Sequence, residues 1–141
     1  MLGPIPLEES SHAHAPFTVG LRRIGDGYWQ FWESVGDGEF SFDFRDVLAD
    51  EQAMSVRCDS LQTSPESRFV QNLVCQVRRP DAQVVLRGRV LSTIARDGKQ
   101  ERTLDSAEEL VAVLESEFGL LAPEAATLWA RICARHEQLM A

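Results

Sequence analysis

The sequence predicts an α+β fold in which antiparallel strands come first and two helices come last. Short aromatic and β-branched runs separated by Gly-Asp-Gly sequences occupy the region from Phe17 to Phe44, a pattern typical of an antiparallel meander. Two longer apolar runs follow on either side of a Pro-Asp turn at residues 80–81. From Asp105 onwards the apolar residues recur at the spacing of a helix. Strands and helices segregated in this way are typical of α+β proteins.

The composition of the chain limits the number of domains it can form and the kinds of partner it can bind. The chain has 141 residues, 44% of them hydrophobic, enough for one domain or two small subdomains. Its formal net charge is −8, so its long-range field repels phosphate backbones and anionic lipid. No apolar run approaches the about 18 residues of a membrane span, and the amino terminus lacks the pattern of a signal peptide. We expect a cytoplasmic protein whose partners include neither nucleic acid nor a membrane.

The first third of the chain is expected to contain a connector and the meander. Residues 1–15 contain two prolines and show neither the period of a strand nor that of a helix, so we expect a connector. Residues 45–52 form a short polar segment with room for one helical turn. The strands of the meander are expected at residues 17–24, 28–35 and 40–44.

A long hairpin is expected next. Its strands are predicted at residues 67–79 and 83–96, joined by a turn at Pro80 and Asp81, which are natural turn residues. Residues 100–104 are predicted to add a third strand. These runs are rich in β-branched residues, which favour strands.

The first predicted helix begins after Asp105 as N-cap, with Glu108 three residues later in a capping-box arrangement, and Gly119 ends it. The second predicted helix covers residues 123–140 and opens with a proline in its first turn. Its apolar stripe comprises Leu128, Ile132 and His136.

The three cysteines show little evidence of a disulfide or of a catalytic role. Cys58, Cys75 and Cys133 form no CxxC pair, and their odd number argues against a disulfide framework, so we expect free thiols. Cys75 is expected to pack in the core, on the strand face of Phe69 and two aliphatic residues. Cys133 and His136 lie three residues apart on a predicted helix, so they are neighbours on its surface. A thiol beside an imidazole is the smallest set of groups that can form an activated nucleophile. Their place along the apolar stripe, with no carboxylate to orient the ring, favours a structural role.

Four motifs carry a family resemblance. In chain order they read "GPIPLE", "TSPESRFVQNLV", "VVLRGRVL" and "ERTLDSAEELVAVLESEFGL", and they extend over residues 3–120. Each motif is weak alone, but the set and its order resemble the carboxyl-terminal half of the arylamine N-acetyltransferases. That family has a Ser/Thr-x-Pro-x-Ser-x-Phe segment leading into a strand, a Leu-rich strand with Arg-Gly-Arg, and a closing helix that ends in Phe-Gly.

The resemblance implies a connector at residues 1–15, a β-barrel subdomain at 16–65 and an α/β lid subdomain with two carboxyl-terminal helices at 66–141. In the family, a cysteine in Arg-Gly-Gly-x-Cys, activated by a histidine and an aspartate, takes an acetyl group from acetyl-CoA and passes it to an arylamine, arylhydroxylamine or hydrazine. The 141 residues contain no Arg-Gly-Gly-x-Cys, and Met1 aligns just after the family's aspartate. We therefore assign no catalytic residue and expect no activity from this chain alone.

The same resemblance assigns three site residues. Ser64 and Ser67 match segment positions that meet the coenzyme, and Phe69 matches an aromatic that walls the acceptor pocket. The alternative is local: serines beside Pro65 commonly stabilise a turn, and the phenylalanine then packs inside.

Two further groups carry open alternatives. His12 and His14 could both bind a metal ion, but the sequence shows no third ligand near them, so no metal is assigned. An arginine cluster across the predicted hairpin either receives a pyrophosphate or forms a solvated strand face; its members are Arg78, Arg79, Arg87 and Arg89.

Two functions therefore remain open. The chain is the carboxyl-terminal part of an arylamine N-acetyltransferase, with coenzyme A and an arylamine as its small-molecule partners. Alternatively it is a stand-alone, non-catalytic module that binds a small ligand or a protein. In either case an exposed apolar patch is expected on the barrel, with a missing amino-terminal half or a second copy as its partner.

Overall fold

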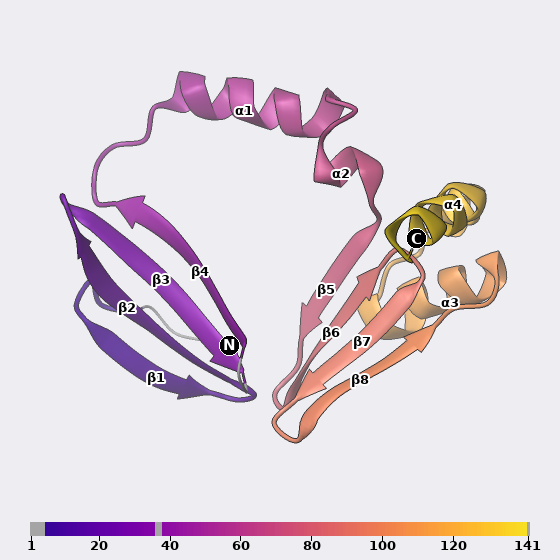
Figure 1. Ribbon diagram of the computed structural model, residues 1–141, viewed down its shortest axis with the longest axis horizontal. Helices are drawn as coiled ribbons and strands as arrows, with labels where there is room; N and C mark the ends of the chain where they lie inside the picture. The colour runs from indigo at the N-terminus through magenta and orange to yellow at the C-terminus, as the bar shows by residue number, and fades with distance from the viewer. Residues whose placement is uncertain (1–4, 36–37, 141) are drawn as a thin grey trace. The chain divides into compact units, whose positions relative to one another are not determined.

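The computed structural model describes residues 5–35 and 38–140. The chain divides into two units. The first contains the residues up to Ala49 and two short hairpin segments, Pro80–Ala82 and Ala95–Gly98, and the second contains the remainder. Each unit holds one antiparallel sheet of four strands, and all helices of the described residues belong to the second (Figure 1). The α+β class is confirmed.

The first sheet is the predicted meander with one extra strand. Its order is β1-β2-β3-β4, and its strands are β1 (Ser10–His14), β2 (Phe17–Gly25), β3 (Tyr28–Val35) and β4 (Gly38–Arg45). Strand β1 lies within the expected connector, where its pairing with β2 joins Ser10 to Leu21 and His14 to Phe17. Residues 1–4 of that connector, and residues 36–37 of the predicted second turn, lie outside the described residues.

The first sheet is open, which corrects the expectation of a barrel. In residues 5–35 and 38–140, β1 and β4 each pair along one edge only. Small closed barrels take about eight strands, and this unit has four. The buried hydrophobic residues of this sheet nonetheless form a small core, which consists of Phe17, Val19, Leu21 and Trp29.

The second sheet has the order β5-β6-β7-β8. Its strands are β5 (Val74–Arg78), β6 (Ala82–Arg87), β7 (Val90–Ala95) and β8 (Gly98–Thr103). The predicted strand over 83–96 is wrong as a single element, because Gly88 adopts a φ of 59° and turns the chain between β6 and β7. The predicted strand over 67–79 also begins late, since residues 68–71 form a helical turn.

Helix α1 (Glu51–Thr63) replaces the expected single turn. Asp50 is its N-cap, and the Oδ1 atom accepts a hydrogen bond from the Ala53 N–H at 2.9 Å. None of its residues is buried, so the sequence carries no apolar period to reveal it. It belongs to the second unit, whereas the division predicted at residue 65 placed it with the barrel. The short α2 (Arg68–Gln71) follows.

The carboxyl-terminal helices largely match the prediction. Helix α3 (Ala107–Phe118) ends, as expected, at Gly119, which adopts φ 68° and ψ 25°. Its N-cap is Ser106 in place of Asp105. The predicted helix over 123–140 is split into a 3₁₀ segment, η1 (Pro123–Leu128), and α4 (Trp129–Met140).

The core of the second unit lies between its sheet and the helices α3 and α4. Its buried members are Val84, Leu86, Leu91, Leu104, Leu110, Val113, Leu114, Ala125 and Ile132. Cys75 is half-buried against this cluster, as predicted, and burial raises the pKa of its thiol. Since Val84 and Leu86 share one face of β6, both helices cover the same face of the sheet.

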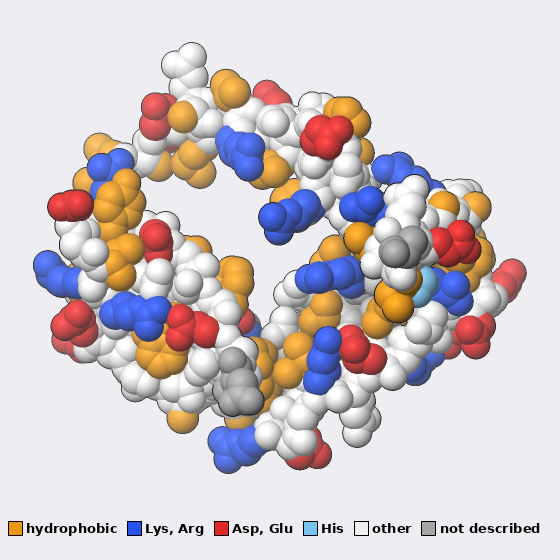
Figure 2. Space-filling model, viewed as in Figure 1, with side chains coloured by type: hydrophobic (Ala, Val, Ile, Leu, Met, Phe, Trp, Pro, Cys, Tyr) orange, Lys and Arg blue, Asp and Glu red, His pale blue; other side chains and the backbone are white. Residues whose placement is uncertain are grey.

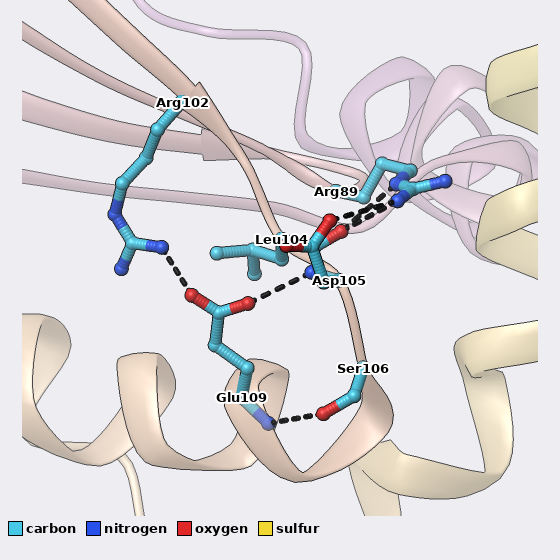
Figure 3. Close-up of polar contacts among 6 residues, drawn as sticks. All are labelled: Arg89, Arg102, Leu104, Asp105, Ser106 and Glu109. Carbon is cyan, nitrogen blue, oxygen red and sulfur yellow. Dashed lines mark hydrogen bonds and ion pairs between the residues drawn. The ribbon is translucent and has the colours of Figure 1, made fainter.

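A polar network joins the end of β8 to the start of α3 (Figure 3). The Ser106 Oγ accepts a hydrogen bond from the Glu109 N–H at 3.2 Å. The Glu109 carboxylate accepts one from the Asp105 N–H at 2.8 Å and forms an ion pair with Arg102. Arg89 donates two hydrogen bonds to the Leu104 carbonyl, at 3.0 and 2.7 Å. The network therefore fixes where the chain leaves the sheet and enters the helix.

Replacing Glu109 with glutamine is expected to destabilise the second unit in a pH-dependent way. The hydrogen bond from the Asp105 N–H, followed by the one from Arg102, lowers the pKa of the Glu109 carboxyl from 4.5. A carboxyl with a lowered folded pKa stabilises the folded state above its unfolded pKa, and this stabilisation is lost as pH falls through the folded pKa. The difference between wild type and Glu109→Gln should thus be present at pH 7 and shrink below pH 4.5.

Urea unfolding at a series of pH values measures this difference. Glu115→Gln is the matched control, because the exposed Glu115 carboxylate has no partner in the described part of the chain. A wild-type advantage over Glu109→Gln that stays constant from pH 7 to pH 3 would contradict the assignment.

Candidate functional site

The three residues assigned from the resemblance lie together on the second unit. Ser64, Ser67 and Phe69 line one groove with a volume of about 900 Å³. The groove is bounded by α1, α2, the start of β5, the end of β6 and α4. Its lining also includes Arg57, Ser60, Leu61, Glu66, Arg68, Gln71, Asn72, Val74, Arg87, Arg135 and Leu139.

Ser67 is buried and its hydroxyl is committed to the backbone. It is the N-cap of α2, where its Oγ accepts a hydrogen bond from the Phe69 N–H at 3.2 Å. The same hydroxyl donates to the Leu61 carbonyl at the end of α1. Ser67 therefore ties α1 to α2, which is the local, turn-stabilising role that the sequence left open.

Ser64 and Phe69 are more available than Ser67. The Ser64 Oγ accepts a hydrogen bond from the Glu66 N–H at 3.3 Å, and its hydroxyl proton has no acceptor in the described residues. Phe69 is 74% exposed on α2. A ring this exposed is not core packing, so the expectation that it continues the apolar face of Cys75 is wrong: α2 turns it out of the strand.

Only one member of the predicted arginine cluster reaches the groove. Arg87, at the end of β6, lines it. Arg79 forms an ion pair with Glu117 at 2.7 Å. Arg89 is held by the Leu104 carbonyl and lies over the Trp129 ring at 5.4 Å.

Three arginines of the groove were not predicted, namely Arg57, Arg68 and Arg135. Arg57 lies on the helix that the sequence did not reveal. Arg68 lies inside the "TSPESRF" motif, so the sequence already placed it between Ser67 and Phe69. Arg135 precedes His136 on α4, and only the packing of α4 against α2 brings it to the groove.

The other candidate groups are not assembled into sites. In the described residues, no hydrogen bond joins Cys133 to His136, and no cluster of three or more His, Cys, Asp or Glu residues is placed to hold a metal. His12 lies on the edge strand β1 and is exposed. No helix among residues 5–35 and 38–140 is long and apolar enough to cross a bilayer.

Comparison with known proteins identifies the family. A family model described as N-acetyltransferase matches residues 6–126, while no curated protein sequence matches the chain. Among solved structures, the chain is similar to the Mycobacterium marinum arylamine N-acetyltransferase in complex with CoA, with a TM-score of 0.77 and 25% identity over 94% of this chain and 49% of that one.

Two further structures agree. The M. smegmatis arylamine N-acetyltransferase matches with a TM-score of 0.78 and 25% identity over 92% of this chain and 48% of its own. The M. abscessus enzyme matches with a TM-score of 0.74 and 27% identity over 90% and 49%. The chain thus spans about half the length of these relatives. With the four motifs in order and the matched residues covering most of the sequence, the chain belongs to the arylamine N-acetyltransferase family.

Proposed function

We propose that this chain is the carboxyl-terminal part of an arylamine N-acetyltransferase-like protein and that it supplies one wall of the coenzyme and acceptor sites. The observation that carries the proposal is the gathering of Ser64, Ser67 and Phe69 on one groove, in a chain that matches the family over residues 6–126. The intact protein would transfer acetyl from acetyl-CoA to an arylamine or hydrazine through a cysteine. Its setting is the cytoplasm.

The groove supports a different role for each residue. The Ser64 hydroxyl is free to donate a hydrogen bond to the coenzyme. Ser67 positions Ser64 and Phe69 by joining α1 to α2. The exposed Phe69 ring offers an apolar wall to an aromatic acceptor. Acetyl-CoA is thus the cosubstrate, and an arylamine the acceptor.

The nucleophile is proposed to lie outside this chain. Cys58 is exposed on α1, and its sulfur accepts a hydrogen bond from Gln62 at 3.0 Å. Burial raises the pKa of the Cys75 thiol, which disfavours the thiolate. Cys133 has no hydrogen-bonded base among the described residues. Among residues 5–35 and 38–140, none of the three therefore has the histidine and carboxylate that activate a catalytic cysteine.

A stand-alone binding module is the second candidate, and the surface of β4 favours it. Phe40 and Phe42 are 59% and 50% exposed. Phe42 stacks on Phe31 with ring centroids 5.1 Å apart, so the aromatic face is continuous. Exposed apolar faces of this kind mark association surfaces.

The chain assayed alone is expected to give no acetyl transfer. The assay measures the rate of coenzyme A release from acetyl-CoA with an arylamine or a hydrazine as acceptor. This rate should equal the rate in buffer without the chain, and Cys58→Ser and Cys133→Ser should leave it unchanged. Transfer that is lost in either variant would place a nucleophile in this chain and contradict the proposal. A cleanly folded chain that binds a ligand unrelated to acetyl-CoA with saturation would favour the stand-alone module.

A further inference from the structure

Strand β4 forms one edge of the first sheet (Figure 1). Among residues 5–35 and 38–140 it pairs with β3 alone, in an unbroken register from Tyr28↔Arg45 to Val35↔Gly38. Within that part of the chain, the N–H and C=O groups on the outer side of β4 therefore face no second strand. An edge of this length is a template for pairing with a further strand.

The side chains of β4 protect this edge on one face only. Charged side chains commonly keep an edge strand from pairing with another chain. In the edge strand β8, charged residues stand on both faces of the sheet. In β4 they are confined to one face, and the other is lined by Phe40, Phe42 and Phe44. Phe40 and Phe42 are exposed, and Figure 2 shows hydrophobic side chains open on the surface of the first unit.

The aromatic row of β4 continues the core of the first unit. The Phe42 ring centroid lies 5.1 Å from that of Phe31, 6.3 Å from that of Phe40 and 6.2 Å from that of Phe44. Phe31 pairs in turn with the buried Leu21. A strand added beside β4 would therefore extend an existing apolar layer, and its own apolar residues would gain burial from water.

The sequence of β4 is complementary to itself. Residues 39–45 read "EFSFDFR", a pattern that is symmetric about Phe42 except that the charges at its two ends are opposite. When two such strands pair antiparallel with a two-fold axis at Phe42, every opposing pair is favourable. These pairs are Glu39 with Arg45, Phe40 with Phe44, Ser41 with Asp43, and Phe42 with its own copy. A two-fold interface requires this reciprocity, because the same surface serves both copies.

Charge repulsion disfavours the neighbouring registers. The outward N–H and C=O groups belong to alternate residues, so two copies match only when the axis passes through a residue and not between two. An axis at Ser41 would set Glu39 against Asp43, and an axis at Asp43 would set that carboxylate against its own copy. Like charges directly opposite destabilise a strand pair. The register centred on Phe42 is therefore favoured.

We propose that two copies of this chain associate through β4, antiparallel and centred on Phe42, so that their first sheets join into one. Glu39 also accepts a hydrogen bond from Arg22 at 2.9 Å, and a carboxylate has room for a second guanidinium donor, here Arg45 of the other copy. One strand edge buries less than the roughly 1,200 Å² of a stable complex, so we expect a dissociation constant on the order of micromolar. Neither a coenzyme nor an acceptor enters the interface, which is independent of the proposed function.

Sedimentation equilibrium of the full chain tests the interface. The average mass should rise with concentration from 15.8 kDa towards twice that value. Glu39→Arg and Arg45→Glu should each raise the dissociation constant about tenfold, because each sets like charges opposite one another at both ends of the strand pair. Mixed in equal amounts, the two variants should associate as tightly as wild type, since one then carries two positive ends and the other two negative ends.

Lys99→Glu is the charge-matched control, because it makes the same change of charge as Arg45→Glu on the edge strand β8. It should associate within twofold of wild type. An equal loss in Lys99→Glu would show that net charge, and not the pairing of β4, controls association, and would overturn the proposal. Circular dichroism of each variant verifies that it is folded.

Three further results would overturn the interface. A chain that stays monomeric up to about 1 mM would leave β4 to a different partner, such as the part of the relatives that this chain does not span. A dimer that Glu39→Arg and Arg45→Glu leave unchanged would use another surface. Variants that fail to associate again on mixing would contradict the register centred on Phe42.

Discussion

Replacing Leu110 with alanine is expected to destabilise the second unit by about 2–5 kcal/mol. Leu110 is fully buried, with 0% of its surface exposed, and it lies in the cluster that joins α3 to the sheet. Removing its side chain loses the burial of its methyl groups and leaves a cavity that the surrounding side chains fill only in part. A loss of this size is a large share of the stability of a small unit.

Urea unfolding followed by the helical circular dichroism signal measures this loss, because the helices of the described residues belong to the second unit. Leu121→Ala removes the same atoms from a side chain that is 80% exposed, and it should change stability by less than about 0.5 kcal/mol. Equal effects of the two variants would show that Leu110 is not a core residue.

Gly20→Ala is expected to have the largest effect on the first unit. An added Cβ at Gly20 would lie 2.2 Å from the Ser10 carbonyl oxygen and 2.6 Å from the Trp32 ring. Gly20 pairs with Ser11 on one side and with Trp32 on the other, so relief requires the strands to separate. Such overpacking costs roughly 1–3 kcal/mol, or more where backbone must move.

Hydrogen exchange read by mass spectrometry locates the effect. Amides of β1 and β2 should lose protection in Gly20→Ala, while those of α3 keep theirs. Gly38→Ala is the control, since a Cβ there meets only the Val35 carbonyl oxygen at 3.5 Å, an ordinary contact. Retained protection in β1 and β2 of Gly20→Ala would contradict this close packing.

The features with strong local signals were predictable from sequence. Asp-Gly turns between aromatic runs gave β2 and β3, and the apolar spacing followed by Gly119 gave α3. Helix α1 and strand β1, which have no buried stripe, were missed. Helix α1 buries none of its residues, and β1 is an edge strand whose central residues are exposed. A pattern of alternating or periodic apolar residues arises only where one face is buried.

The candidate site was predictable only where it follows one stretch of chain. The motif around Pro65 gave Ser64, Ser67 and Phe69, and the structure places all three on one groove. Arg68 of that groove lies in the same stretch, but Arg57, Arg87 and Arg135 reach it from α1, β6 and α4, whose packing the sequence does not reveal. Arg89 shows the converse case, because it stands two residues from Arg87 yet serves the chain's own backbone.

The most direct test of the central claim is a chimera. This chain would replace the structurally matching half of the M. marinum arylamine N-acetyltransferase, leaving the rest of that enzyme unchanged. We predict that the folded chimera transfers acetyl from acetyl-CoA to an arylamine, and that Phe69→Ala raises its KM for the amine. A chimera that unfolds cooperatively but transfers no acetyl would contradict the account.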